Sequence, residues 1–196
     1  GFAVVPFIRV YRDRADYGTW HANPDIAQMI EDEAKRGYYR GVGEFHIFGR
    51  EAASEVVKRI VNFAVARDLV LHAHCDEAAL ELLFAHNPQA RIIWAHTGFN
   101  TPLARVEELF AKYPRLWGEL SYRWDVTEGG RLTPEWKAFF TKHAARFLVG
   151  SDTWVNQRWQ SYPETMGNYR CWLAELPPEA AERIAWKNGA ALFGLN

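Results

Sequence analysis

Two neighbouring stretches decide the fold: Val70-Leu71-His72-Ala73-His74-Cys75-Asp76-Glu77 and, further along, Arg91-Ile92-Ile93-Trp94-Ala95-His96-Thr97-Gly98. Each is a short apolar run that ends in histidine and passes into a helix start, as a buried parallel strand does when it delivers a polar group to its carboxyl end. A third run, Arg146-Phe147-Leu148-Val149-Gly150-Ser151-Asp152, ends in a carboxylate. Such strand ends predict a metal site that can generate a hydroxide nucleophile.

Further strands extend this pattern along the chain. Their expected midpoints, at Val42, Val70, Ile92, Trp117 and Phe147, recur every 22 to 30 residues, which is the length of one βα unit. With a strand at 4–11, about six βα units are present. No glycine-rich loop follows the first strand, which weighs against a doubly wound nucleotide fold. The sequence therefore predicts an α/β fold of the (β/α)8 TIM-barrel type, incomplete at its N-terminus.

Capping signals place the helices between these strands. We expect a strongly periodic helix over 50–67, and helix starts at Asn23-Pro24, Asp76, Thr101-Pro102 and Thr133-Pro134. A loop rich in tryptophan and tyrosine is expected over 154–162, followed by a helix near 163–176. A last helix should begin at Pro177-Pro178 and run to about Phe193.

Composition indicates one domain, 1–196, that binds a small molecule. The 196 residues carry 23 Lys and Arg against 24 Asp and Glu, so no basic surface for nucleic acid is expected. Cys75 and Cys171 lie in unrelated surroundings, which suggests neither a disulfide framework nor a thiolate zinc site, and a cytoplasmic setting is the default. No apolar run is long enough to span a bilayer, so no membrane partner is expected.

The candidate metal ligands are His74, His96 and Asp152. His72 and His74 point to the same face of one strand, so only one is needed, and His74 is nearer the carboxyl end, with His72 deeper. Asp152 is also a candidate catalytic base, although it could instead cap a helix. His96 is a candidate ligand or electrophile. The remaining histidines outside strand ends are interpreted as structural: His21, His86 and His143.

Glu44 has two possible roles. A carboxylate in Gly41-Val42-Gly43-Glu44-Phe45 would be costly to bury unless it binds a metal or pairs with an arginine such as Arg9. Both alternatives stay open. The arginines are possible anchors for a substrate carboxylate, and Trp154 suits a flat, apolar ligand. The candidate substrate contacts are Arg9, His46, Glu119, Arg123, Trp154 and Arg158.

These motifs resemble a known family. Ala73-His74-Cys75-Asp76, Ile93-Trp94-Ala95-His96-Thr97-Gly98, Val149-Gly150-Ser151-Asp152 and the C-terminal 182–194 are similar to the amidohydrolase superfamily, in particular the amidohydrolase-related metal-dependent hydrolases. The resemblance implies a TIM barrel in which His74 and His96 supply ligands from the fifth and sixth strands. It also implies that Asp152, after the eighth strand, takes a proton from a metal-bound water.

The same resemblance extends to Glu44 and shows one departure. Gly43-Glu44-Phe45-His46 is similar to the fourth-strand glutamate motif of the TatD-like branch, in which that glutamate carries a metal. The family's first strand ends in a His-x-His pair, and no such pair precedes Val4. The strand at Val4 would then be the third of eight. We therefore expect exposed barrel edges that favour a homo-oligomer, weak or absent metal binding, and little turnover.

Three functions follow as hypotheses. The first is a metal-dependent hydrolase that activates water on a divalent ion, zinc by ligand type, to attack a small-molecule carbonyl, ester, lactone or amide bond. The second is a metal-dependent decarboxylase of an aromatic or unsaturated acid, since the same branch contains decarboxylases. The third is a catalytically inactive fragment that only binds a partner.

Overall fold

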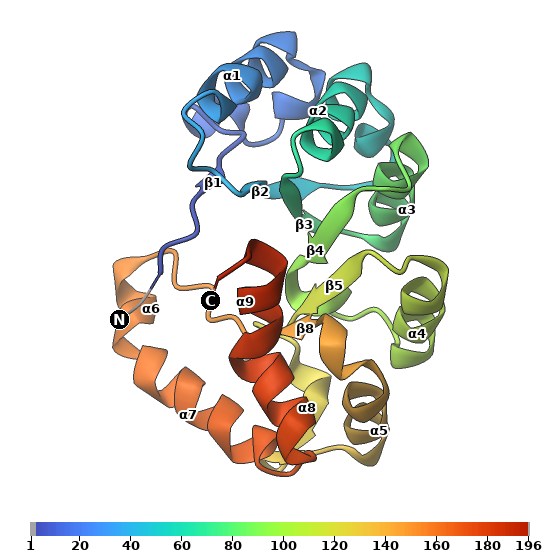
Figure 1. Ribbon diagram of the computed structural model, residues 1–196, viewed down its shortest axis with the longest axis vertical. Coiled ribbons are helices and arrows are strands. Elements are labelled where there is room, and N and C mark those ends of the chain that lie inside the picture. The colour runs from blue at the N-terminus through green and yellow to red at the C-terminus, as the bar shows by residue number, and fades with distance from the viewer. Residues whose placement is uncertain (1–2, 196) are drawn as a thin grey trace.

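A six-stranded parallel sheet forms the centre of the protein. The computed structural model describes residues 3–195 and gives the strand order β1-β2-β3-β4-β5-β8, with every neighbouring pair parallel (Figure 1). The strands follow one another in chain order, as the successive βα units of a barrel do. The α/β prediction is confirmed. The strand bounds are Phe7–Ile8 (β1), Gly41–Ile47 (β2), Val70–Cys75 (β3), Arg91–Trp94 (β4), Leu116–Glu119 (β5) and Phe147–Leu148 (β8).

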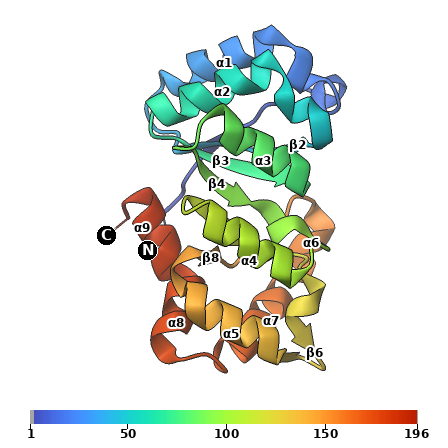
Figure 2. The ribbon, with the colours of Figure 1, turned by 90° about the vertical axis from the view of Figure 1, so that its right-hand side faces the viewer.

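Helices α1 to α5 follow one another along the outer side of this sheet (Figures 1 and 2). The expected caps hold at three of them: Asn23, Asp76 and Thr133 each accept a backbone N–H of the first turn. Thr101 does not cap α4: the N-cap position is Pro102, no side chain accepts an N–H there, and the Thr101 hydroxyl donates to Gly98 O. The bounds are Pro24–Ala34 (α1), Glu55–Ala66 (α2), Glu77–His86 (α3), Leu103–Lys112 (α4) and Pro134–His143 (α5).

The C-terminal helices pack against β8 and β1. Asn188 donates through Nδ2 to Ala144 O and Phe147 O, and the Phe193 ring lies 5.7 Å from the Phe7 ring. The end of the chain therefore contacts both outer strands of the sheet. The bounds are Asn156–Gln160 (α6), Tyr162–Leu173 (α7), Pro178–Glu182 (α8) and Asn188–Phe193 (α9), with a π-helical turn at Arg183–Lys187 joining the last two.

Several boundaries differ from the sequence prediction. The strand expected over 4–11 pairs only at β1, because it has a single neighbour in the described chain. The helix expected over 50–67 is broken at Ser54, whose extended backbone separates a 3-10 turn (Gly49–Ala53) from α2. The expected loop 154–162 contains α6. A hairpin of β6 (Thr127–Glu128) and β7 (Arg131–Leu132) was not predicted.

The predicted domain 1–196 includes Gly1, Phe2 and Asn196, which lie outside the described residues. The interior is filled by large apolar side chains of the central strands and the helices on them, among them Phe45, Trp94 and Phe147. Within 3–195, no helix combines the length and the apolar character needed to cross a membrane.

Candidate metal centre

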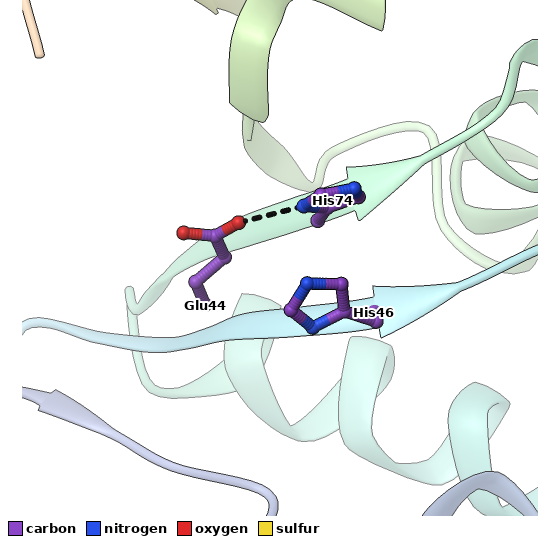
Figure 3. Close-up of side chains that lie close together, drawn as sticks. All are labelled: Glu44, His46 and His74. Carbon is purple, nitrogen blue, oxygen red and sulfur yellow. Dashed lines mark hydrogen bonds and ion pairs between the residues drawn. The ribbon is translucent and has the colours of Figure 1, made fainter. Parts of the chain in front are cut away.

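Three potential ligands from two adjacent strands meet at the carboxyl end of the sheet. Glu44 and His46 of β2 and His74 of β3 each place one donor atom within 4.8 Å of the others. The register of β2 on β3 shifts between Gly43 and Phe45, and beyond this shift His46 pairs with His74. Glu44 Oε1 lies 3.0 Å from His74 Nδ1, and Figure 3 shows the three side chains converging.

His96 joins this group from the end of β4. Its Nε2 lies 3.7 Å from Glu44 Oε1, and its ring centroid is 4.9 Å from that of His74. His96 and Thr97 both have left-handed backbone angles, with φ of 55° and 45°. Such angles cost on the order of 1–3 kcal/mol for a residue with a β-carbon, and they persist where surrounding contacts enforce them. The turn therefore aims His96 into the site.

The inner side of His96 is held by buried polar groups. Its Nδ1 lies 2.8 Å from the carbonyl oxygen of Ser121 and 2.9 Å from Ser121 Oγ. Its backbone N–H donates to Glu119 Oε2 at 2.9 Å, and the Thr97 hydroxyl donates to Glu119 O. Both ring nitrogens of His96 are thus oriented, with Nε2 toward Glu44 and Nδ1 toward Ser121, just after β5.

Asp152 lies at the edge of the site and is tied to an arginine. Its Oδ2 accepts from Arg158 Nη1 at 2.6 Å, and the guanidinium stands 4.5 Å from the ring of Tyr122 and 5.4 Å from that of Trp154. The backbone of Asp152 is also left-handed, with φ of 45°. Among residues 3–195, the group of close donor atoms comprises Glu44, His46 and His74. Of the two other predicted ligands, His96 contacts this group through Glu44, and Asp152 is bonded to Arg158 instead.

Burial and neighbouring charges shift the pKa values of these groups. Burial alone would raise the pKa of Glu44, but its hydrogen bonds with His74 and His96 outweigh burial and hold that pKa well below its ordinary value. Burial, helped by the charge of His74, lowers the pKa of His46 to about 4. Burial raises the pKa of Asp152, and Arg158 opposes the shift. The site thus combines an ionised carboxylate with a neutral imidazole.

The donor set fits a divalent metal such as zinc, which binds imidazole nitrogens and carboxylate oxygens. His46 Nδ1 lies 3.0 Å from the Tyr11 hydroxyl, which also accepts the backbone N–H of His46 at 2.7 Å. The Tyr11 hydroxyl can either donate to His46 Nδ1 or accept a proton from it. In the tautomer with the proton on Nδ1, the lone pair of His46 Nε2 is available to a metal. Metal-binding histidines are commonly oriented by such a second hydrogen bond.

His46 was expected to contact substrate, and the structure brings it into the group of close donor atoms. The alternation of Glu44 and His46 along β2 is the sequence signal for this, since alternate residues share a face. His72 lies deeper on β3, and its Nε2 is buried without a hydrogen-bond partner within the described chain. The contribution of Tyr11 has no such signal, because it comes from a segment 35 residues away.

Of the three arginines predicted to anchor a substrate carboxylate, Arg9 and Arg123 have other contacts. The alternative ion pair between Arg9 and Glu44 is wrong, since Glu44 pairs with His74 and His96 and the Arg9 guanidinium stands 5.8 Å from the ring of Tyr11. Arg123 is buried, and its guanidinium donates to Asp125 and to the carbonyl oxygens of the turn after β4. Arg158 alone of the three bonds a predicted site residue, Asp152.

A cavity of about 430 Å³ opens beside the site, between the ends of β5 and β8 and helix α7. Its walls mix aromatic and hydroxyl-bearing side chains, including Tyr122, Ser121, Ser151 and Tyr169. Ser121 touches His96, and Ser151 precedes Asp152 in the chain. The cavity therefore adjoins His96 on its Ser121 side and offers room for a small organic molecule there.

A parallel α/β sheet with a histidine and carboxylate cluster at its carboxyl end defines the class of barrel-type metal-dependent enzymes. The family model "Amidohydrolase" matches residues 19–195. The chain therefore belongs to the amidohydrolase family. This membership supports a metal-dependent hydrolase in general. No curated protein matches the chain.

Solved structures agree on the fold. An amidohydrolase from Burkholderia multivorans with bound HEPES is 19% identical, with a TM-score of 0.61 over 90% of this chain and 71% of that one. The same protein with bound zinc gives 17% identity and a TM-score of 0.55, over 89% and 81%. Amidohydrolase 2 from Bifidobacterium longum subsp. infantis gives 12% and 0.53, over 89% and 77%. The (β/α)8-type assignment, as a partial barrel, is thus confirmed.

Proposed function

We propose that this chain is a zinc-dependent hydrolase of a small molecule that carries a carbonyl, ester, lactone or amide bond. The observation that carries the proposal is the convergence of Glu44, His46 and His74, with His96 Nε2 3.7 Å from Glu44 Oε1. Bound zinc supplies Lewis acidity and lowers the pKa of a water toward 7. The bound zinc of a similar amidohydrolase supports the choice of metal.

The chain's own residues divide the work around that ion. Glu44, His46 and His74 hold the metal, and His96 is the fourth proposed ligand, through Nε2. Asp152 is the proton acceptor, because its carboxylate interacts with the charges of Glu44 and His96 and its pKa is raised by burial. Arg158 keeps Asp152 oriented through its 2.6 Å ion pair. The adjacent cavity takes the organic part of a small-molecule substrate, in a cytoplasmic setting.

Metal content provides the first test. The purified chain is loaded with zinc, desalted and assayed by elemental analysis beside His74→Ala and a histidine control outside the site, His86→Ala. We expect zinc in the wild type and the control and a strong loss in His74→Ala, because one ligand of a small set is removed. Equal zinc in all three proteins would contradict the proposed ligands.

Product analysis separates the reaction classes. Loaded protein is incubated with a panel of esters, lactones, amides and unsaturated acids, and the products are followed by mass spectrometry. Addition of one water supports hydrolysis, whereas release of carbon dioxide supports the decarboxylase alternative. Asp152→Asn should abolish turnover and retain most of the metal, because the amide cannot accept the proton. Metal binding without turnover on any substrate would favour the inactive alternative.

A further inference from the structure

Glu119 is a buried carboxylate with no ion-pair partner other than a histidine in the described chain. Its residue surface is 8% exposed, and its Oε2 lies 3.7 Å from His96 Nδ1. It accepts three hydrogen bonds: from the backbone N–H of His96, the backbone N–H of Ser121 and the Ser121 hydroxyl, at 2.9, 2.6 and 2.9 Å. A carboxylate with its oxygens so occupied is not free to contact a substrate.

The hydrogen bonds determine which nitrogen of His96 carries the proton. The Ser121 carbonyl can only accept, so the 2.8 Å contact requires a proton on His96 Nδ1. The Ser121 hydroxyl donates its single proton to Glu119 Oε2, and therefore it can only accept a hydrogen bond from His96 Nδ1. Both contacts demand the same tautomer. The lone pair of neutral His96 is then on Nε2, the nitrogen that faces Glu44.

We infer that Glu119 is a positioning residue that acts through Ser121 to hold His96 in the Nδ1–H tautomer, with Nε2 presented to the metal. This role rests on the proposed function and replaces the substrate contact predicted from the sequence. Glu119 also receives the backbone N–H of His96 in the left-handed turn, so it fixes the main chain and the ring together.

Close packing keeps the carboxylate in this place. A side chain at Gly150 would collide with Glu119 Oε1, so the strand end that leads to Asp152 can approach only because residue 150 is glycine. Gly118, next to Glu119, likewise has no room for a β-carbon against Phe147 and Thr97. Glu119 thus lies where β4, β5 and β8 meet, and it contacts the turn that carries one ligand and the loop that carries the proton acceptor.

Glu119→Gln tests the assignment, because glutamine keeps the shape but must turn an NH2 group toward one of the donors. The first readout is the ¹⁵N NMR spectrum of the His96 ring in metal-free protein at alkaline pH, which distinguishes Nδ1–H from Nε2–H. The second is the dissociation constant of zinc, by competition titration. We expect loss of the pure Nδ1–H signal and roughly 10–100-fold weaker zinc binding, as for other groups that orient metal ligands.

Glu128→Gln is the matched control, the same change at an exposed position of the β6–β7 hairpin, and should leave both readouts unchanged. If Glu119→Gln does not fold, Ser121→Ala carries the test, with a partial change in tautomer and a few-fold loss of zinc affinity. An unaltered Nδ1–H signal and unaltered zinc affinity in a folded variant overturn the inference. If zinc fails to bind the wild type, the proposed function fails, while the NMR readout still decides the role of Glu119.

Discussion

The imidazole of His46 is neutral near pH 7 because it is partly buried and lies beside another ring. Its ring centroid is 4.1 Å from that of His74, and its pKa is lowered to about 4. Glu44 has the opposite character, since its lowered pKa keeps it ionised. A neutral nitrogen donor next to a charged oxygen donor suits a divalent cation, whose ligands must be deprotonated.

Acidification should destabilise the metal-free protein through His46. The ordinary histidine pKa of about 6.5 applies in the unfolded state, and the folded-state pKa is about 4, so between about pH 6.5 and 4 the unfolded chain binds the extra proton and stability falls with falling pH. His96, whose pKa is raised, contributes stability that is lost only as pH rises above 6.5. In urea titrations at several pH values, His46→Gln should therefore flatten the slope by at most about 1.4 kcal/mol per pH unit, less for partial exposure.

A variant whose stability depends on pH as steeply as that of the wild type would show that His46 does not titrate in this way. Zinc binding should weaken over the same range, since the metal and the proton compete for the imidazole nitrogens. This second measurement uses the loaded protein and is independent of the unfolding experiment.

Asp76 joins two elements at the same rim of the sheet. Its Oδ1 accepts the N–H of Ala79 at 2.8 Å and so caps α3, and its carboxylate also accepts the N–H of Gly49, at the start of the 3-10 turn before α2. The residue directly follows β3, which carries His74. One side chain thus fixes the helix start and a neighbouring loop just beyond a ligand strand.

Replacing Asp76 with alanine should lower the free energy of unfolding by about 1–2 kcal/mol, the usual cost of losing an N-cap plus part of a second hydrogen bond. Asp76→Asn, which keeps a capping oxygen, should cost less. Thermal unfolding followed by circular dichroism measures both. A loss as large in the asparagine variant as in the alanine variant would mean that the charge, and not the cap, is what matters.

Elements with a strong local signal were predictable from the sequence. The apolar runs before His74 and His96 and the caps at Asp76 and Thr133 are local patterns, and the strands and helices follow them closely. The two-residue length of β1 was not predictable, because it depends on how many neighbours a strand finds. In the site, the ion pair of Asp152 with Arg158 and the Ser121 contact of His96 join segments through loop geometry, which no periodicity encodes.

At the scale of the molecule, each outer strand of the sheet has one strand neighbour and a contact with the C-terminal helix α9. In the described chain, β1 pairs only with β2, and β8 pairs only with β5. Asn188 donates to Phe147 O on the β8 side, and the Phe193 ring lies 5.7 Å from the Phe7 ring on the β1 side. Val4, three residues before β1, is 77% exposed in a segment without regular secondary structure. An open edge with an exposed apolar side chain favours pairing with another chain.

We therefore predict that the protein self-associates through β1 and the segment before it, and that Val4→Lys weakens this association, because a charge next to an edge strand opposes pairing. Sedimentation velocity over a range of concentrations measures it. Trp124→Lys is the matched control, since Trp124 is 73% exposed but lies next to the distant β6–β7 hairpin. We expect a concentration-dependent dimer in the wild type and the control and more monomer in Val4→Lys. An equal effect of both substitutions would contradict the β1 edge as the interface. A monomeric wild type would contradict it too, and would mean that the α9 contacts with Phe7 and Phe147 are enough to cover both outer strands.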